Sequence, residues 1–370
     1  MTTATSPSKT KKRRAARATF RSAEPRLLHA ADLHVGDSRN LPGYLERQQQ
    51  ALAELTRLSI EQQVDVALYA GDIYDSKYMR PREKDMFLQW LLANDRAADK
   101  HDFDVIIEAG NHDEIEDGYT HLHGLKILQD HGTLRRTEIV VNPRVLGPYK
   151  DRIYVAAVPA GAYPNETLNQ AVTTMRRTLD MKVEQAGQNP DGIYFVAMLH
   201  EGIYGATNEA GTYRVTKGPR LDPDAPVTYW ALGDIHKPFQ QMLPNAWYPG
   251  SPIQHDFGDA TAERGALLVN LDAPTEPTPL IVQGVRPLVT LHDVPEQWPD
   301  AIIRFVGTPD EIAAAQLPEQ VVKLRPTVDD VQVRPRTTDD PFEQLDDVMR
   351  GMGIPTPFHE PVKAAIQAAL

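Results

Sequence analysis

Five short blocks of carboxylate, imidazole and amide side chains recur along this chain, and these are ligand types that hard divalent cations accept. Two such cations about 3.5–4 Å apart can share one carboxylate, generate hydroxide near neutral pH and hold both oxygens of an in-line phosphoryl displacement. The chain has no cysteine, so thiolate ligands are excluded. The pattern predicts a two-metal phosphoesterase site formed by Asp32-Leu33-His34, Gly71-Asp72, Gly110-Asn111-His112-Asp113, His200 and Gly233-Asp234-Ile235-His236.

The metals expected here are Mn²⁺, Mg²⁺ or Fe²⁺, because oxygen ligands mixed with imidazole disfavour a closed structural zinc site. We expect manganese. Each block follows an apolar run that is typical of a buried strand, at 26–31, 64–70, 103–109, 193–199 and 227–232. Helical spacing of apolar residues predicts helices over 44–63, 81–99 and 165–185. Alternating strands and helices indicate an α/β fold, in which loops leaving strand ends can converge on one crevice.

The order of the blocks resembles that of the calcineurin-like metallophosphoesterases. Further motifs resemble their DNA-processing branch, the SbcD-type nuclease subunits, and the similarity runs from about residue 26 to about residue 330. These motifs are Ala231-Leu232-Gly233-Asp234-Ile235-His236-Lys237-Pro238, Tyr248-Pro249-Gly250-Ser251-Pro252-Ile253-Gln254 and Phe257-Gly258-Asp259. The resemblance implies two packed mixed β-sheets flanked by helices, a small α+β capping domain and a C-terminal helical hairpin.

The resemblance also implies a role for each block. One metal would be held by Asp32, His34, Asp72 and His236, and the other by Asp72, Asn111, His200 and Asp234. Asp72 would bridge the two ions. His112 would face the phosphate and stabilise or protonate the departing oxygen, with Asp113 orienting its ring. Asp75 is a candidate carboxylate behind the ligands.

Asp234 departs from the family pattern, which usually has Gly-His-x-His at this point. A carboxylate can replace an imidazole on a hard cation, and the added negative charge favours Mn²⁺ or Mg²⁺. The alternative is that Asp234 points away and the second metal is weakly held. We favour ligation because the remaining ligands are all present.

Other candidate residues carry weaker signals. Lys237, His255 and Tyr204 are candidate substrate contacts beside or between the blocks, although an exposed lysine or a tyrosine that anchors its own loop would look the same. Tyr204 lies on a Gly- and Thr-rich loop over 201–226. We expect His29 to be structural, and His121 and His123 to lie on a helix surface.

Charge is unevenly distributed along the 370 residues. The net charge is −12, and residues 1–26 hold eight Lys or Arg against one Glu, which gives +7 and leaves −19 for the rest. The basic tail is either a nucleic-acid arm or a solubilising extension. An acidic body argues against tight, independent DNA binding, so a partner would supply the basic groove. The resemblance implies an SbcC-type coiled-coil ATPase, and this chain itself has no Gly-x-x-x-x-Gly-Lys-Ser/Thr phosphate loop.

Composition, together with the positions of proline and charged residues, predicts four segments. These are a disordered basic tail (1–25), a nuclease domain (26–285), a capping DNA-binding domain (286–330), and a linker with a helical ATPase-binding segment (331–370). No apolar run is long enough to span a bilayer, and the N-terminus lacks a hydrophobic signal core. We therefore expect a protein of the cytoplasm, or of the host cytoplasm if the source is a virus.

The function predicted from the sequence is an Mn²⁺-dependent DNA nuclease of repair or recombination, working as a homodimer with the ATPase. It would act as an exonuclease on duplex ends, with endonuclease activity on single strands as a secondary expectation. One alternative is a phosphatase or phosphodiesterase for small substrates. Another is a DNA-end-binding scaffold protein with weak chemistry.

Overall fold

A computed structural model describes residues 24–36, 41, 43–116, 118–207, 214–259, 263–315, 317–319 and 321–326. Within these residues the main body contains two six-stranded mixed sheets. The first sheet has the order β14 (Thr278–Ile281), β13 (Gly265–Asn270), β1 (Arg26–Ala30), β2 (Val66–Ala70), β3 (Asp104–Glu108) and β6 (Thr137–Val140). The second has the order β11 (Phe239–Gln240), β12 (Ala246–Tyr248), β10 (Tyr229–Gly233), β9 (Tyr194–His200), β8 (Ile153–Val158) and β7 (Arg144–Tyr149).

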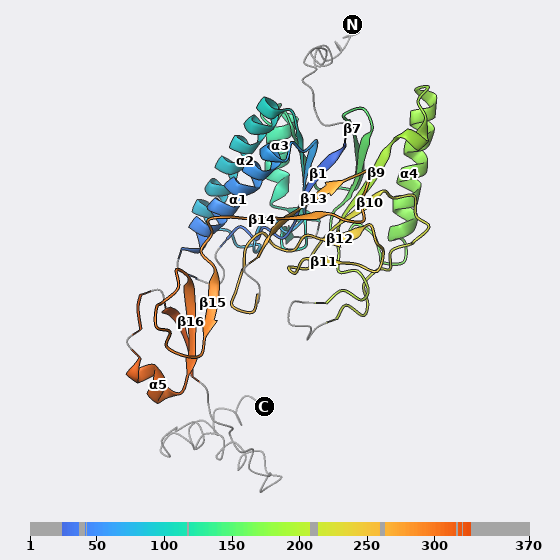
Figure 1. The fold of residues 1–370 in the computed structure, drawn as a ribbon. Coiled ribbons are helices and arrows are strands. Elements are labelled where there is room, and N and C mark those ends of the chain that lie inside the picture. The colour runs from blue at the N-terminus through green and yellow to red at the C-terminus, as the bar shows by residue number, and fades with distance from the viewer. Residues whose placement is uncertain are drawn as a thin grey trace, which may run out of the picture. The chain divides into compact units, whose positions relative to one another are not determined.

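Helices cover the outer faces of the two sheets (Figure 1). The first sheet is covered by α1 (Tyr44–Glu61), α2 (Pro81–His101) and α3 (Leu122–Asp130), and the second by α4 (Leu168–Gln185). A short hairpin of β4 (Glu114–Glu116) and β5 (Tyr119–Thr120) precedes α3, and a 3₁₀ turn, η1 (Pro190–Gly192), precedes β9. The predicted fold class and the predicted helices over 44–63, 81–99 and 165–185 are confirmed, with ends shifted by a few residues.

Alternation along the strands divides the core into three layers. Leu27 and Leu28 are neighbours in β1, yet Leu27 packs between the two sheets and Leu28 packs between the first sheet and its helices. Successive side chains of a strand point to opposite faces, so a strand buried on both faces is apolar throughout. Phe195 of β9 belongs to the third layer, which lies against α4. The five predicted strands are all present for this reason.

Strand direction determines the edge of each sheet at which the sequence blocks lie. In the first sheet β1, β2, β3 and β6 are parallel, and in the second sheet β8, β9, β10 and β12 are parallel. The carboxyl ends of parallel strands lie at one edge, where loops converge. All five sequence blocks lie at the ends of β1, β2, β3, β9 and β10.

Later in the chain, β15 (Leu288–Leu291), β16 (Ile302–Gly307) and β17 (Val321–Pro326) form a three-stranded sheet, with α5 (Pro309–Ala314) after β16. The helix starts at a capping box in which Thr308 Oγ1 accepts the Glu311 N–H and Pro309 occupies the first turn. The segment 286–330, which was predicted to hold a small α+β domain, thus contains both strands and a helix. The chain divides into two compact units, Met1–Arg304 with Leu317–Lys323 and Phe305–Gln316 with Leu324–Leu370. The capping-domain boundaries at 286 and 330 stay a prediction.

Two predicted segments fall outside the described residues. They are most of the basic tail (1–25) and the linker with the helical hairpin (331–370). Among the helices that the structure does describe, none has both the length and the apolar character required to cross a bilayer.

Candidate metal centre

Main-chain hydrogen bonds join the loops that follow β1 and β2. Asp32 N–H donates to Gly71 O at 3.1 Å, and His34 N–H donates to Asp72 O at 2.9 Å. The loop after β10 joins them, because Asp234 N–H donates to Asp32 Oδ1 at 3.1 Å. Three of the predicted blocks therefore form one connected turn structure across the two sheets.

Asp72 lies at the centre of this structure. Its Oδ2 lies 3.4 Å from His34 Nε2, and its Oδ1 lies 3.2 Å from His200 Nε2. His34 Nε2 is in turn 3.0 Å from His236 Nε2, and His200 Nε2 is 3.1 Å from Asn111 Oδ1. Each oxygen of one carboxylate thus faces a separate group of potential ligands, which is the arrangement that a bridging carboxylate requires.

The backbone at these ligands is unusual. Asp32, His34, Asp72 and Asp234 all have positive φ, at 54°, 42°, 50° and 98°. Non-glycine residues rarely adopt this left-handed conformation, and when they do the surrounding structure must hold them there. The folded body therefore imposes the ligand positions on a backbone that would not adopt them alone.

Neighbouring glycines allow the loops to approach closely. A Cβ at Gly71 would lie 2.2 Å from His200 Nδ1, and one at Gly110 would lie 2.2 Å from Asp72 Oδ1. A Cβ at Gly233 would lie 2.0 Å from Ala70 O. Ala70 O also lies 2.7 Å from His200 Nδ1 and accepts its proton, which leaves Nε2 as the ring nitrogen that faces Asp72 and Asn111.

These residues fit divalent cations. Asp32, His34, Asp72 and His200 are buried, and Asp32 Oδ2 has no hydrogen-bond partner among the described residues. Burial, together with the nearby Asp72 and Asp234 carboxylates, raises the pKa of Asp32 to about 8. Buried carboxylates so close together need a positive charge, which bound cations supply.

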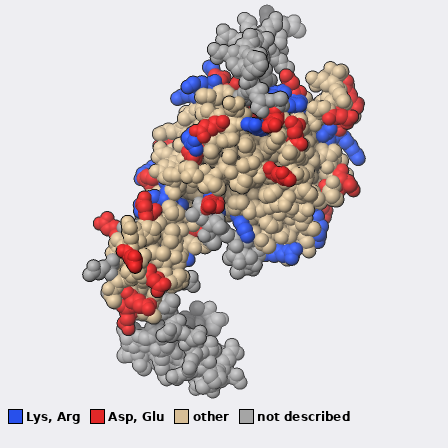
Figure 2. Space-filling model, in the orientation of Figure 1, with Lys and Arg blue, Asp and Glu red and all other residues tan. Residues whose placement is uncertain are grey.

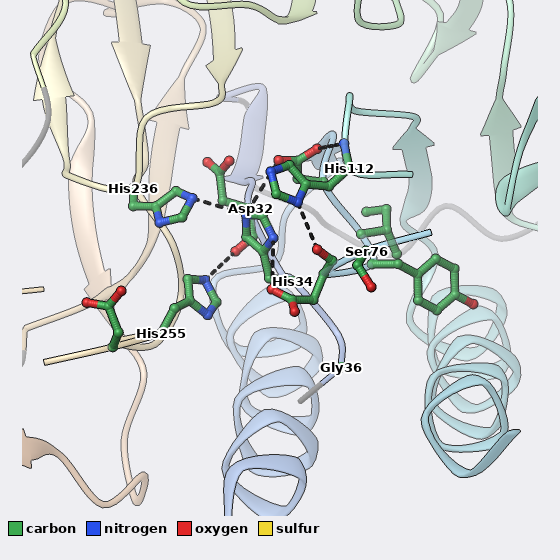
Figure 3. Close-up of polar contacts among 12 residues, drawn as sticks. Asp32, His34, Gly36, Ser76, His112, His236 and His255 are labelled. Atoms are coloured by element: carbon green, nitrogen blue, oxygen red, sulfur yellow. Dashed lines mark hydrogen bonds and ion pairs between the residues drawn. The ribbon is translucent and has the colours of Figure 1, made fainter. Parts of the chain in front are cut away.

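Figure 3 shows how the side chains converge on Asp32 and His34, with His236 and His255 on one side and His112 on the other. Among the described residues, three groups have ligand atoms within 4.8 Å of one another: His34 with His236 and His255, His34 with Asp72 and His112, and Asp32 with Asp72 and His200. The two groups that contain Asp72 share its carboxylate. The arrangement can hold two metal ions.

Residues 25–238 match the family described as calcineurin-like phosphoesterase. The chain belongs to this family. The SbcD component of the nuclease SbcCD from Bacillus subtilis is 26% identical over 292 residues, which cover 71% of this chain and 71% of that protein. A protein of the same name from Rhodobacter capsulatus is 24% identical over 320 residues, covering 79% of this chain and 77% of that protein. The family and these relatives support a metal-dependent phosphoester hydrolase.

Among solved structures, a dimetal phosphatase from Danio rerio matches with a TM-score of 0.38 and 11% identity. The match covers 66% of this chain and 92% of that one.

In this phosphoesterase, the partner of His112 differs from the prediction. His112 Nδ1 donates to the main-chain oxygen of Asp75 at 2.8 Å. Asp113 is buried and accepts main-chain N–H groups from Ile73 (3.2 Å), Tyr74 (2.8 Å) and Gly110 (2.8 Å). The expectation that Asp113 orients the His112 ring was wrong, because its carboxylate joins two loops through their backbones. Burial and the Asp72 charge raise the pKa of Asp113 to about 7, against the effect of those three donors.

Asp75 contributes two groups to the site. Its carbonyl holds His112, and its buried carboxylate Oδ1 lies 3.7 Å from His34 Nδ1. This is the place expected of a carboxylate behind the ligands.

Asp234 is half-buried, and its carboxylate lies against Gly202, where a Cβ would come within 2.8 Å of Oδ2. It belongs to none of the three close groups found in the described part of the chain. Burial, with the nearby charge of Asp72, raises the pKa of Asp234. Ligation by Asp234 stays a prediction.

The candidate assignment of His255 as a substrate contact was wrong. It is buried at 1% exposure, behind the ligands rather than in front of them. Its Nε2 lies 3.0 Å from Asp32 O, and its Nδ1 lies 2.6 Å from the hydroxyl of Tyr44, 211 residues away. Sequence reasoning missed Tyr44 entirely, because its position fits an ordinary core residue of α1.

The remaining candidate residues lie in ordinary structural environments. Tyr204 stacks on the Arg220 guanidinium, 3.3 Å from the ring centroid, so one face of its ring is covered by its own chain. Lys237 is half-buried beside His236. His29 is buried with Nδ1 2.9 Å from the Tyr229 hydroxyl, so its structural assignment is confirmed. His123 stacks on Tyr119, with ring centroids 4.4 Å apart, at the start of α3.

Proposed function

We propose that this phosphoesterase is a metal-dependent nuclease that hydrolyses DNA phosphodiesters. The observation that carries the proposal is the Asp72 carboxylate, whose two oxygens face His34 and His200 at 3.4 and 3.2 Å. One carboxylate shared between two ligand groups suits two-metal hydrolysis of a phosphate ester. The relatives are named as components of the nuclease SbcCD, which supports a nucleic acid as the ester that is cleaved, and the resemblance to the DNA-processing branch of the family favours DNA.

The first cation would be held by Asp32, His34, Asp72 and His236, and the second by Asp72, Asn111, His200 and Asp234. When bound, the two cations would supply an activated nucleophile and neutralise the phosphate charge. The donor set contains oxygen and imidazole and no sulfur, which supports Mn²⁺ as the preferred ion. Asp234 adds a carboxylate in place of an imidazole and strengthens that preference.

His112 would serve the leaving group. Its side chain is exposed, and its ring centroid is 4.8 Å from that of His34. Because Asp75 O can only accept, Nδ1 carries a proton. Nε2 carries a second proton in the imidazolium form of the ring, and that is the proton that would pass to the departing oxygen, leaving a neutral imidazole. The hydrogen bond from His112 N–H to Asp72 Oδ1, at 2.9 Å, fixes the loop against the shared carboxylate.

The DNA-binding surface would be completed by other polypeptides. On the face that Figure 2 draws, Lys and Arg are interspersed with Asp and Glu rather than gathered in one basic patch. With a net charge of −12, such a surface gives little phosphate affinity by itself. The relatives are named as one component of a nuclease called SbcCD, which supports a partner of the SbcC type. The family resemblance implies that this partner is a coiled-coil ATPase. The proposed complex would act in DNA repair or recombination.

Further proposals concern segments and assembly. We propose that residues 286–330 guide DNA toward the metals, that residues 331–370 bind the ATPase, and that two copies of the chain form a homodimer. Exonuclease action on duplex ends is proposed as the main activity, with cleavage of single strands as a second one.

Cleavage of an end-labelled duplex and of a labelled single strand in Mn²⁺ tests the proposal, with Asp72→Asn as the site variant. Asp65→Asn is a matched control. Asp65 immediately precedes β2, at the end of the strand opposite to Asp72, and its carboxylate accepts the Arg26 N–H at 3.0 Å. We expect the wild type and Asp65→Asn to degrade DNA and Asp72→Asn to lose at least 100-fold. If both DNA substrates stay intact with the wild type while bis(p-nitrophenyl) phosphate is hydrolysed, the chain is a small-substrate phosphodiesterase when alone.

A further inference from the structure

Behind the proposed metal ligands, a buried tyrosine and a buried histidine form a chain of hydrogen bonds to the first ligand residue. The Tyr44 hydroxyl lies 2.6 Å from His255 Nδ1, and His255 Nε2 lies 3.0 Å from the main-chain oxygen of Asp32. Tyr44 belongs to α1, while His255 lies on the loop after β12. Both side chains are 1% exposed. They lie too deep to touch a substrate.

The direction of the hydrogen bonds follows from the acceptor. A carbonyl oxygen can only accept, so His255 carries its proton on Nε2 and donates it to Asp32 O. Its Nδ1 is then an acceptor for the Tyr44 O–H. Both ring nitrogens are used in these contacts, so His255 is not placed to ligate a metal, although its ring belongs to a close group with His34 and His236.

The carbonyl that His255 holds lies in the left-handed turn of the ligand loop. Asp32 has a φ of 54° and His34 a φ of 42°. The carbonyl of His34 accepts from Gln48 Nε2, and Gly36 N–H donates to Gln48 Oε1 at 3.1 Å. Gln48 also belongs to α1. Two side chains of one helix thus control the turn, Gln48 directly and Tyr44 through His255.

The His255 ring also touches the ligand rings themselves. Its centroid is 4.9 Å from that of His34 and 5.1 Å from that of His236, with the planes inclined at 74° and 70°. Figure 3 shows His255 on the same side of the site as His236, directed toward Asp32. It therefore forms a wall behind the two imidazoles that would hold the first metal.

We propose that Tyr44 and His255 are a positioning pair that sets the metal affinity of this phosphoesterase by fixing the Asp32 carbonyl and the His34 and His236 rings. The inference rests on the proposed metal centre, and it assigns residues that neither ligate metal nor touch substrate. Removing a residue that supports a metal ligand from behind commonly lowers the affinity for the metal 10- to 100-fold.

The fold supplies a matched control for the tyrosine. His29 and Tyr229 form a second buried pair, with Nδ1 2.9 Å from the hydroxyl, that contacts none of the proposed ligand side chains in the contacts described. Tyr44→Phe and Tyr229→Phe each remove one hydroxyl from a buried histidine. We expect Tyr44→Phe to raise the dissociation constant of Mn²⁺ about tenfold and Tyr229→Phe to leave it unchanged. Free Mn²⁺ can be counted by electron paramagnetic resonance during titration of the full chain.

Two substitutions at His255 separate its two hydrogen bonds. His255→Gln keeps a donor near the position of Nε2 and loses the acceptor for Tyr44. His255→Asn keeps an acceptor near Nδ1 and loses the donor to Asp32. We expect Asn to weaken Mn²⁺ binding more than Gln, because the bond to the Asp32 carbonyl is the one that shapes the ligand turn.

The outcomes separate this inference from the function on which it rests. If the wild type binds no Mn²⁺, the metal centre itself is wrong. If the wild type binds two ions and Tyr44→Phe binds them equally well, the positioning pair is refuted while the metal centre stands. Equal losses in Tyr44→Phe and Tyr229→Phe would also refute it, because they would report a general loss of stability. Should the His255 variants not fold, the two tyrosine variants decide alone.

Discussion

A methyl group added at Gly71 should disable the metal centre while leaving the fold intact. In the structure, a Cβ at this position lies 2.2 Å from His200 Nδ1 and 2.3 Å from His200 Cγ. Real Cβ atoms essentially never approach closer than 3.0 Å, so the ring must move by at least the difference of 0.8 Å. Metal–ligand distances tolerate about 0.2 Å. The displaced His200 should therefore no longer hold an ion together with Asp72.

The same substitution also strains the backbone, and a control must separate this effect. Gly71 has a φ of +80°, where alanine costs roughly 1–2 kcal/mol. Gly187 has a φ of +73°, and nothing lies within 4 Å of its added Cβ. Gly187→Ala therefore carries the strain without the collision. Both variants should lose a few degrees in Tm, and Gly71→Ala can lose somewhat more because of the collision.

The assay is Mn²⁺ stoichiometry and DNA cleavage for the wild type and both variants. We expect Gly71→Ala to bind no more than one ion and to lose cleavage at least 100-fold, and Gly187→Ala to match the wild type. Full binding of two ions by Gly71→Ala would show that His200 is not a ligand. Loss of metal in Gly187→Ala would show that strain anywhere is sufficient, and would equally refute the reasoning.

Three further predictions concern chemistry, pH and metal removal. His112→Ala should slow DNA cleavage by about 10²–10⁴-fold but slow hydrolysis of bis(p-nitrophenyl) phosphate far less, because nitrophenolate leaves without a proton; equal losses on both esters would remove the acid role, and rate assays at saturating Mn²⁺ decide. Burial lowers the pKa of His29 to about 3 from 6.5, so the unfolded chain takes up the proton first as pH falls below 6.5. Between pH 6.5 and 5 this costs about 1.6 kcal/mol of stability. Urea unfolding at both pH values should show the wild type losing that much more stability than His29→Gln, and equal losses in the two proteins would contradict the assignment. Removing divalent cations with a chelator should lower Tm, since ions at 100 times their Kd stabilise by about 2.7 kcal/mol, whereas Asp72→Asn should respond little; an equal response would place the stabilising ions elsewhere.

The sequence positions of the ligands were predictable, because each ligand is marked by its residue type and by the apolar run beside it. Burial of a strand on both faces requires an apolar run, and such runs precede Asp32, Asp72, Asn111 and Asp234 and include the approach to His200. Loops at the carboxyl ends of parallel strands share one edge, so ligand types in the loops indicated a common site. The motif order, which resembles one family, predicted the two-sheet architecture that the structure confirms.

Contacts behind the ligands could not be predicted in this way. Asp113 has the residue type and spacing of an orienting carboxylate, yet its partners are the backbone N–H groups of Ile73, Tyr74 and Gly110. The partner of His112 is a main-chain oxygen, which has no sequence signature. Any residue at position 75 would carry that carbonyl, so residue type alone could not identify it.

Residue types and their spacing are sufficient to predict the available chemistry: a cysteine-free set of carboxylates, imidazoles and one amide, at the ends of strands that had to be buried. How those groups are held depends on contacts that form only in the folded chain. The left-handed backbone at the ligands and the contact of Tyr44 with His255, 211 residues apart, exist because two sheets and a helix pack together. Periodicity reports which face of an element is buried, but the partner of a buried polar atom depends on packing between elements that are distant in the chain.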